Sequence, residues 1–511
     1  MTMNKPMSEE NSNPDAVLSV VIVGRDLACW LTALGLVSVF GRQKVRIEVV
    51  ELPSLIRNSD TVSSLSMLEG FHTLLGISES EIITQCQATF SLGHSFANFS
   101  KTQPPFFHPY GRHGQDIAKI DFMQFWVKAR QSGLPVDFDV FSLNTVAAKQ
   151  ERFFLPTDEL YKATKSGHGY HFLAKAYIQH IKALAIKRGV QVHSSLTAIG
   201  KISQDTGHID SLILPNGQEL KADLFIDASG FEGLLIKQAL KTPFMSWQDY
   251  FRHDRILTTS GARLKSLPPY AQTRALEDSL LHLVPLQHQT GLIHSYNSHT
   301  LSDQSALETA AIVSNIRPDP KAQTLVTPLN VGHGSQLWVK NCVAIGEAGF
   351  SLYPIDNVGL HAIQLAIVHL INLFPLTSDM ALEARAYNEI MLPSLEQIRD
   401  FQLSHFKLNQ YIDSPYWDAM RRMALPDSLA HKIEVFKACG QVVLYDHESF
   451  DADDWKSVFL GHGLMPQSYD HQVDQMDEAY VIQQFQSMIA YLKEQVNDMV
   501  SHDKFLDIYA Q

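Results

Sequence analysis

The fold is decided by residues 17–51, which read VLSVVIVGRDLACWLTALGLVSVFGRQKVRIEVVE. The β-branched run at 17–23 is typical of a buried parallel strand. Residues 26–40 carry an apolar face and predict a helix, and residues 45–50 predict a second strand that closes on Glu51. A strand, a glycine turn, a helix and a strand within about 35 residues predict a βαβ unit of the dinucleotide-binding kind.

The turn of this unit departs from the usual fingerprint, which places glycine at three positions. Here those positions hold Gly24, Asp26 and Cys29. Asp26 is either an N-cap of the helix or a carboxylate that occupies the place of a pyrophosphate, and both roles would use the same amides. Glu51 is either a ligand of a ribose hydroxyl or a solvated strand-end residue. The candidate cofactor contacts of the unit are Gly24, Asp26, Ala28 and Glu51.

Two later strands also run into small-residue turns. The strand at 224–227 is followed by Ala-Ser-Gly, and the strand at 337–345 enters Gly346. Such a turn carries flavin contacts in many flavin folds, or is an ordinary strand-to-helix connection. An Asn216-Gly217 pair between two apolar runs predicts a β-hairpin.

Composition excludes several classes of function. The chain has 511 residues, of which 45% are hydrophobic, and a net charge of -13. An acidic chain is unsuited to non-specific contact with nucleic acid or anionic membranes. Four scattered cysteines and a polar N-terminus without a signal-peptide pattern predict a cytoplasmic protein whose residues 1–16 are disordered. No cluster has the spacing of metal ligands.

Six long blocks of the sequence form a joint pattern. They are FFHPYGRHG (Phe106–Gly114), the helix-forming stretch Tyr170–His193, DLFIDASGFEGLLIKQAL (Asp223–Leu240), VPLQHQTG (Val284–Gly291), AIGEAGFSLYPIDNVGLHAIQ (Ala344–Gln364) and Gly440–Asp470. Together these blocks resemble the flavin-dependent tryptophan halogenases, and agreement over segments of this length is not expected by chance.

The resemblance implies an α/β fold, with a Rossmann-like FAD-binding module of the aromatic-hydroxylase type, a mixed sheet and a helical substrate module. In that family a separate flavin reductase supplies reduced FAD, and chloride or bromide is oxidised to hypohalous acid. The acid passes through an internal channel to a lysine, which works with a glutamate to halogenate an aromatic such as tryptophan. A dry channel protects the oxidant from water.

The resemblance also divides the chain. The FAD-binding module takes residues 17–375, interleaved with substrate-binding segments at about 60–160 and 230–335. Residues 376–511 form a helical C-terminal region, which packs either on a second subunit, giving a homodimer, or on its own core.

Carried over residue by residue, the family lysine falls on Ser91 and the family glutamate on Asp356. Serine forms neither a charged hydrogen bond nor a chloramine. Gly346 and Gly359 fall on flavin contacts. The positions that the resemblance places at the halide or the substrate are Phe107, His108, Pro109, Asn357 and Val358.

Further departures lie in functional loops, while the scaffold blocks stay close to the family. Two tryptophans that separate substrate from flavin are here Leu280 and His282. Three hypotheses follow: an enzyme with altered oxidative chemistry, a non-catalytic relative that binds flavin, an aromatic ligand or a protein, and a fold that reports only ancestry.

Overall fold

The computed structural model describes residues 19–509. Its βαβ unit consists of β1 (Ser19–Gly24), α1 (Asp26–Lys44) and β2 (Arg46–Glu51), which confirms the order read from the sequence. β1 lies between β2 and β13 (Leu224–Ala228), and pairs in parallel with both. Because both faces of this sheet are covered, its strands are almost fully buried, as the β-branched runs predicted.

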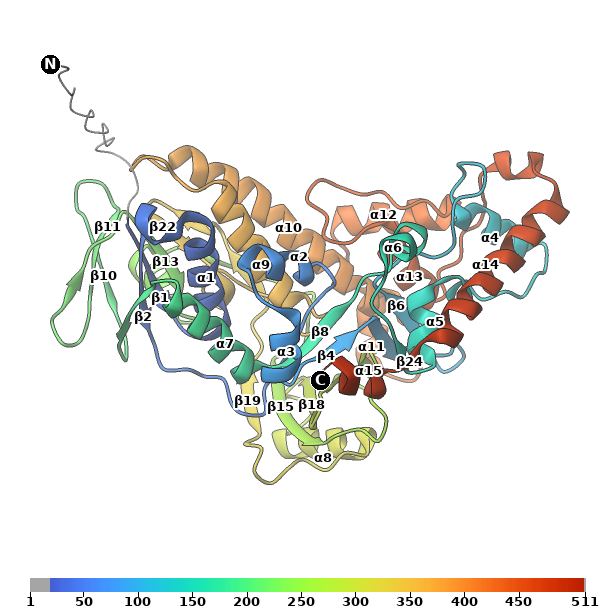
Figure 1. Ribbon diagram of the computed structural model, residues 1–511, viewed down its shortest axis with the longest axis horizontal. Coiled ribbons are helices and arrows are strands. Elements are labelled where there is room, and N and C mark those ends of the chain that lie inside the picture. Colours follow the sequence, from blue (N-terminus) through green and yellow to red (C-terminus); the bar gives the residue numbers. More distant parts are fainter. Residues whose placement is uncertain (1–18, 510–511) are drawn as a thin grey trace, which may run out of the picture.

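The nucleotide-type sheet is mixed. Its strand order is β21-β22-β13-β1-β2-β9, and only the β21–β22 pair is antiparallel. The remaining strands and the covering helices are β9 (Gln191–Ser194), β21 (Trp338–Val339), β22 (Cys342–Ala344), α7 (Ala174–Lys187), α9 (Val358–Asn372) and α10 (Ala381–Lys407). Asn216-Gly217 makes the predicted turn between β11 (Ile209–Ile213) and β12 (Glu219–Leu220), at the far left of Figure 1.

A second, seven-stranded sheet has the order β19-β15-β18-β17-β16-β5-β6. Its strands are β5 (Gly93–Ala97), β6 (Phe106–Pro109), β15 (Arg255–Ala262), β16 (Ala271–Ala275), β17 (Ser279–Pro285), β18 (Gln289–Tyr296) and β19 (Leu325–Pro328). A small sheet joins β3 (Thr61–Ser63), β8 (Gly169–Leu173) and β4 (Thr89–Ser91) between the two large ones.

The C-terminal helices lie mainly beyond the second sheet, at the right of Figure 1. The shorter helices of the chain are α2 (Leu68–Leu75), α3 (Glu79–Gln85), α4 (Phe122–Gln131), α5 (Leu143–Lys149), α6 (Asp158–Thr164), α8 (Asp303–Ser314), α11 (Pro415–Arg422), α12 (Asp427–Cys439), α13 (Ala452–Gly461), α14 (Glu478–Asp498) and α15 (His502–Tyr509).

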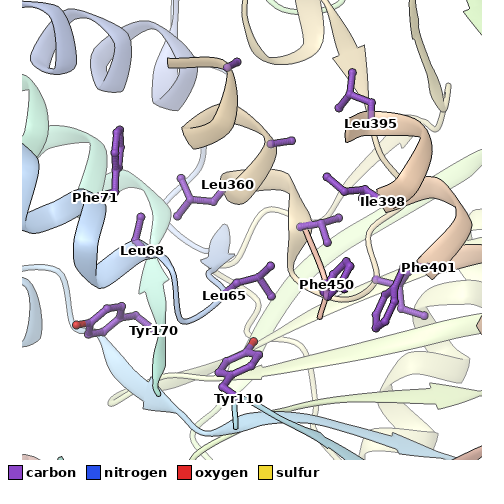
Figure 2. Packing of buried hydrophobic residues seen from close by; sticks show 14 of the residues in the cluster. Leu65, Leu68, Phe71, Tyr110, Tyr170, Leu360, Leu395, Ile398, Phe401 and Phe450 are labelled. Atoms are coloured by element: carbon purple, nitrogen blue, oxygen red, sulfur yellow. The ribbon is translucent and has the colours of Figure 1, made fainter. Parts of the chain in front are cut away.

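One large core runs between the modules. Figure 2 shows Leu360 of α9 pointing toward α2, while Phe401 of α10 lies beside Phe450. The rings of Phe401 and Phe450 stack with centroids 3.6 Å apart. Tyr110 lies below α2 and α9 in the same view, with its hydroxyl turned into the core. The first module and the C-terminal region therefore share one packed interior.

The end of the described chain is tied back to early strands. β24 (Val500–Ser501) pairs with β7 (Arg152–Phe153), and the amide of Phe90 donates to Nε2 of His502 over 3.2 Å. Glu79 accepts hydrogen bonds from the hydroxyls of Tyr170 and Tyr509 and pairs with His168 at 3.0 Å. Although burial alone raises it, these hydrogen bonds bring the pKa of Glu79 down to about 2.

Replacing Glu79 by glutamine is expected to lower the free energy of unfolding by about 2–3 kcal/mol at pH 7. The pKa of the folded state lies below the ordinary glutamate value, so the stabilisation is complete above about pH 5 and is lost as the pH falls toward 2. Urea unfolding at pH 7, 5, 4 and 3 should show the gap between wild type and Glu79→Gln shrinking to roughly half by pH 3. The control is Glu81→Gln on the same helix, where Glu81 is exposed. If wild type and Glu79→Gln differ by the same free energy of unfolding at every pH, the lowered pKa of Glu79 is contradicted.

Candidate functional site

The turn after β1 keeps the one glycine that its geometry demands. A Cβ on Gly24 would lie 2.5 Å from the carbonyl oxygen of Ala228, so β1 and β13 approach too closely for any side chain. This contact is between strands. Gly24 therefore shapes the turn through packing.

Asp26 does not cap the helix, which corrects the N-cap interpretation. The N-cap is Arg25, which makes no side-chain capping bond. Asp26 has φ 55°, and its carboxylate accepts from the hydroxyl of Ser54 and from the amide of Leu55 at 3.1 Å. The carboxylate bonds the loop that follows β2, and not the amides of α1, because this loop lies beside the turn.

Glu51 lies at the end of β2, as predicted, but already has a cation. The ammonium of Lys182 on α7 lies 2.5 Å from Oε1 of Glu51 and 5.0 Å from the ring centroid of Trp30. Among residues 19–509, no hydrogen bond involves the other carboxylate oxygen of Glu51. That oxygen remains available to a ligand hydroxyl.

Two more carboxylates reach the turn region. A Cβ on Gly230 would lie 3.5 Å from Glu232 and 3.8 Å from Glu347, so both acids approach the same glycine. Desolvation raises the pKa of Glu347 above its ordinary value, and the charge of Asp26 adds to this shift. Arg25 pairs with Glu232 at 3.5 Å, and the charge of Lys237 acts on Glu347. Carboxylates and cations therefore share the region where a dinucleotide fingerprint places a pyrophosphate.

A cavity of about 390 Å³ opens beside this turn. Gly346, with φ 68°, lies against Ala28, since a Cβ there would be 2.7 Å from the methyl of Ala28. Asn357, Val358 and Gly359 line the other side at the N-terminus of α9. A Cβ on Gly359 would meet no atom within 4 Å. Of the predicted flavin contacts, Gly346 and Gly359 line this cavity and Ala28 lies against Gly346. We name it the Gly346–Gly359 cavity.

Asn357 lines the cavity and directly follows the buried Asp356, and both residues have positive φ. Asp356 is buried, and its Oδ1 lies 3.1 Å from Nε2 of His405. Its Oδ2 is buried with no hydrogen-bond partner among the described residues. The side-chain amide of Asn357 lies 3.3 Å from Nδ1 of His94 and 3.5 Å from the hydroxyl of Tyr110.

Buried histidines surround these residues. Nε2 of His94 lies 2.8 Å from the hydroxyl of Thr273, which lies 3.0 Å from Nδ1 of His282. The two rings stack with centroids 4.9 Å apart. Burial lowers the pKa of His282 to about 4, and lowers the pKa of His94 well below its usual value. Both imidazoles are therefore neutral at physiological pH and carry hydrogen bonds without positive charge.

Ser91 is completely buried at the end of β4 and donates to the carbonyl of Gly93 over 3.0 Å. Its hydroxyl also lies against the phenol of Tyr110, and burial raises the pKa of that phenol. Tyr110 thus stands beside the position where the family resemblance places a lysine.

A second cavity, of about 780 Å³, lies on the other side of Tyr110. Its wall includes Leu65, Met67 and Phe450, and its polar lining has the carboxylates Glu69, Asp451, Asp453 and Asp454 against the cations Arg112 and Lys165. We name it the Tyr110 cavity.

The aromatic loop divides between two faces. His108 lines the Tyr110 cavity and pairs with Asp454 at 2.8 Å, whereas Phe107 packs edge-on against Tyr270. Burial alone lowers the pKa of His108, but the bond to Asp454 raises it above the ordinary value. Pro109 pairs with Gly93 in the β5–β6 ladder.

Sequence reasoning missed His94, Tyr110, His405 and His462. These residues lie in four separate segments and meet only in the folded chain. The one local signal in the sequence is the position of His462 between Gly461 and Gly463.

The family is decided by comparison with known proteins. A family model described as tryptophan halogenase matches residues 19–478. The chain belongs to the tryptophan halogenase family. Tryptophan 6-halogenase ThaL of Streptomyces albogriseolus is 26% identical over 489 residues, covering 88% of this chain and 90% of the relative.

Solved halogenase structures agree with the fold. BrvH, a flavin-dependent halogenase from Brevundimonas sp. BAL3, superposes with a TM-score of 0.91 at 30% identity, covering 97% of this chain and 99% of that structure. Xcc4156, a flavin-dependent halogenase from Xanthomonas campestris, gives 0.91 at 28% identity, with 97% and 98% covered. These matches confirm the predicted α/β halogenase fold.

Between residues 19 and 509, no helix has the length and apolar character needed to cross a membrane. Over the same residues, no group of three or more His, Cys, Asp or Glu side chains is arranged to hold a metal ion.

Proposed function

We propose that the chain catalyses flavin-linked oxidation or halogenation of an electron-rich, tryptophan- or indole-like aromatic held in the Tyr110 cavity. The observation that supports this most is the contact between Asn357 and Tyr110. Asn357 lines the Gly346–Gly359 cavity, Tyr110 lines the Tyr110 cavity, and 3.5 Å separates the amide from the phenol. Two cavities that share a wall one side chain thick suit the passage of a small oxidant.

The Gly346–Gly359 cavity suits the flavin ring of FAD. Gly346 and Gly359 line the cavity, a Cβ on Gly359 would meet no atom within 4 Å, and Glu51 has a free oxygen for a hydroxyl of the cofactor. Reduced FAD, supplied by a separate reductase, would provide the reducing equivalents for activating oxygen. At the diphosphate end the carboxylates Asp26 and Glu347 oppose binding, because they carry the same charge as the phosphates.

The start of α9 suits a chloride or bromide ion. Asn357 provides no side-chain cap, so the first amides of the helix keep their hydrogen-bonding capacity. Backbone amides and the helix dipole both favour an anion there. This part of the family chemistry depends on backbone groups and is unaffected by Asn357 and Val358.

Separate side chains of the protein have separate roles in the proposed reaction. Asp356 offers an unpartnered oxygen for the proton that an aromatic carbon loses. Ser91 supplies no amine, so Tyr110 and Asn357 are left to orient the oxidant by hydrogen bonds. His282 lines the Gly346–Gly359 cavity at the place of a family tryptophan, which opens a route for direct oxygen transfer to the substrate.

The deciding experiment has two stages. An anaerobic titration with reduced and oxidised FAD is followed by turnover with a flavin reductase, oxygen and chloride or bromide, over a panel of tryptophan, indole and tryptamine. We expect binding of reduced FAD and an aromatic product of increased mass. Binding without product under any halide or reductase supply would remove the enzymatic proposal.

A binding protein is the second candidate function, and the absence of an amine at Ser91 favours it. In that case the Tyr110 cavity still takes an aromatic ligand, and FAD serves at most as a bound group. Ligand affinity without oxidised product, measured on the same panel by calorimetry, identifies this outcome.

Replacing Asp26 by asparagine is expected to tighten FAD binding by about 3- to 10-fold, because removal of one like charge near a phosphate is worth on the order of 1 kcal/mol. Asparagine tolerates the positive φ of this position and retains an acceptor for Leu55. The affinity is measured by anaerobic fluorescence titration. Asp205→Asn, in an exposed turn, is the matched control. An unchanged affinity for Asp26→Asn would show that the phosphates bind elsewhere.

The charge of the Tyr110 cavity predicts a substrate preference. Four carboxylates against two cations favour a positively charged aromatic. We expect tryptamine to exceed indole-3-acetate in kcat/KM by about tenfold at low salt, and the ratio to fall at high salt because exposed charges are screened. A preference for the acid would place the substrate in another cavity.

A further inference from the structure

A third cavity lies on the face of the seven-stranded sheet that α8 covers. Its volume is about 970 Å³, and none of its lining residues lines the Tyr110 cavity or the Gly346–Gly359 cavity. Its wall is formed by β16, β17, the C-terminal end of α8 and the loop at 262–268. α8 lies at the bottom of Figure 1, below β15 and β18. We name this space the Arg274 cavity.

The alternation of side chains along two strands separates this cavity from the flavin side of the sheet. On β16, Arg274 lines the Arg274 cavity, whereas its neighbour Thr273 bonds His282 over 3.0 Å. On β17, Leu283 lines the Arg274 cavity, whereas its neighbour His282 lines the Gly346–Gly359 cavity. Successive side chains of a strand point to opposite faces of a sheet. A ligand in the Arg274 cavity would therefore lie across the sheet from the proposed flavin site.

Cations gather in this cavity although the chain as a whole has a net charge of -13. Its lining carries four cations against a single carboxylate, that of Glu151. The cations are Arg263, Lys265, Arg274 and Arg317. Arg263 pairs with Asp503, and within residues 19–509 no ion pair involves any of the other three. A concave surface with three unpaired cations attracts an anion.

The guanidinium of Arg274 is held in place with one nitrogen left over. Nε donates to the side chain of Gln272 over 2.6 Å, and Nη1 donates to the carbonyl of Val313, in the last turn of α8, over 2.7 Å. Nη2 makes no hydrogen bond within the described part of the chain, and it is not among the sealed polar atoms that lack a partner, so solvent reaches it. Burial lowers the pKa of Arg274, and a bound anion would stabilise its charged form. The free nitrogen is therefore oriented before a ligand arrives.

Apolar side chains form another part of the wall. Leu283 is buried and Leu264 is half-buried, whereas Ile312 on α8 is 79% exposed. A ligand body that covered these side chains would remove apolar surface from water. The cavity therefore suits a molecule that joins an anionic group to an apolar body.

We propose that the Arg274 cavity binds an organic phosphate ester, with its phosphate against Arg274, Lys265 and Arg317 and its apolar body against Ile312. Guanidinium and ammonium groups both donate charge-assisted hydrogen bonds to phosphate oxygens. Three unpaired cations suit a dianionic phosphate better than the single charge of a carboxylate. The site is independent of the proposed reaction, because its wall contains no residue to which that reaction assigns a role.

The first test is a calorimetric titration of the full-length protein with 1-naphthyl phosphate and with 1-naphthol, which is the same ring system without the phosphate. At about pH 7.5 a phosphate monoester carries close to two negative charges. We expect the ester to bind at least about tenfold more tightly than the naphthol at low salt, and this ratio to shrink at high salt. Equal affinities at low salt would overturn the proposal. The titration uses neither flavin nor turnover, so its result stands whether or not the proposed function holds.

Charge variants locate the phosphate. Lys265 and Arg317 are exposed, and their side chains make no hydrogen bond among residues 19–509, so Lys265→Gln/Arg317→Gln should fold. We expect this double variant to bind 1-naphthyl phosphate about tenfold more weakly than wild type. Arg385→Gln, exposed on α10, is the matched control and should bind like wild type. Wild-type affinity in the double variant would overturn the site. A loss of affinity in Arg112→Gln instead would place the ester in the Tyr110 cavity and would also overturn it.

A third measurement tests the apolar half of the site. Because Ile312 is so exposed, Ile312→Ser should fold like wild type. We expect this variant to bind 1-naphthyl phosphate about threefold more weakly, since less apolar surface is covered, and to bind inorganic phosphate unchanged. Unchanged affinity for the ester would show that its body lies elsewhere and would overturn the assignment of Ile312.

Discussion

Replacing Asp356 by asparagine is expected to slow the aromatic reaction by about 10²- to 10⁴-fold, the range over which general bases contribute. The substitution removes the charge of a carboxylate buried beside Asn357 and keeps the size of the side chain. Asparagine also suits the positive φ of 63° at this position. Turnover with reductase, oxygen and halide measures the effect, while anaerobic titration should find FAD affinity unaltered.

Asp356→Glu is the informative companion variant. Glutamate restores the family's residue but fits a positive φ poorly, so we expect a folded protein with lower thermal stability and with activity above that of Asp356→Asn. Turnover of Asp356→Asn within threefold of wild type would remove Asp356 from the proposed chemistry.

Replacing Lys432 by methionine is expected to lower the free energy of unfolding by about 3–5 kcal/mol, because it leaves a buried carboxylate without its cation. The ammonium of Lys432 is completely buried on α12 and lies 2.5 Å from Oε1 of Glu448. It also lies 4.5 Å from the ring centroid of Trp455 and bonds the carbonyl of Val443. Burial lowers the pKa of Lys432, and the charge of Glu448 opposes this shift.

The control is the double variant Lys432→Met/Glu448→Gln, which removes both charges and should recover at least half of the lost stability. Urea unfolding at pH 7 compares the three proteins. A loss below about 1 kcal/mol in the single variant would show that water reaches Glu448. Because Glu448 precedes Ser449 and Phe450, which line the Tyr110 cavity, the variant also reports whether that wall depends on the ion pair.

The βαβ unit was predictable because local patterns specify it. The apolar run at Val20–Val23 is wholly buried, and the hairpin turn at Asn216-Gly217 follows from backbone preferences alone. The family blocks added the outline of the second module. Gly346 and Gly359 belong to one continuous block of the sequence, and both line the same cavity.

The hydrogen-bond network was not predictable, because it depends on distant segments. His94, His405 and His462 come from a strand, a long helix and a loop, and no periodicity relates them. The N-cap interpretation of Asp26 was wrong for a related reason. Its carboxylate bonds Ser54 and Leu55, about thirty residues away, in preference to the helix that it begins. The cavities likewise arise from packing between modules.

The contact between His502 and Phe90 has a consequence for how the chain is made. Ser91 follows Phe90 directly, so the strand that carries it is held by a residue synthesised 412 positions later. Tyr509 adds a second late contact, to Glu79. The ribosome makes a chain slowly, starting from its N-terminus. Contacts between residues this far apart in the sequence form late in folding. A nascent chain can therefore complete its first βαβ unit early and pair β4 with β8, while the contact of Phe90 with His502 forms only after residue 502 has been made.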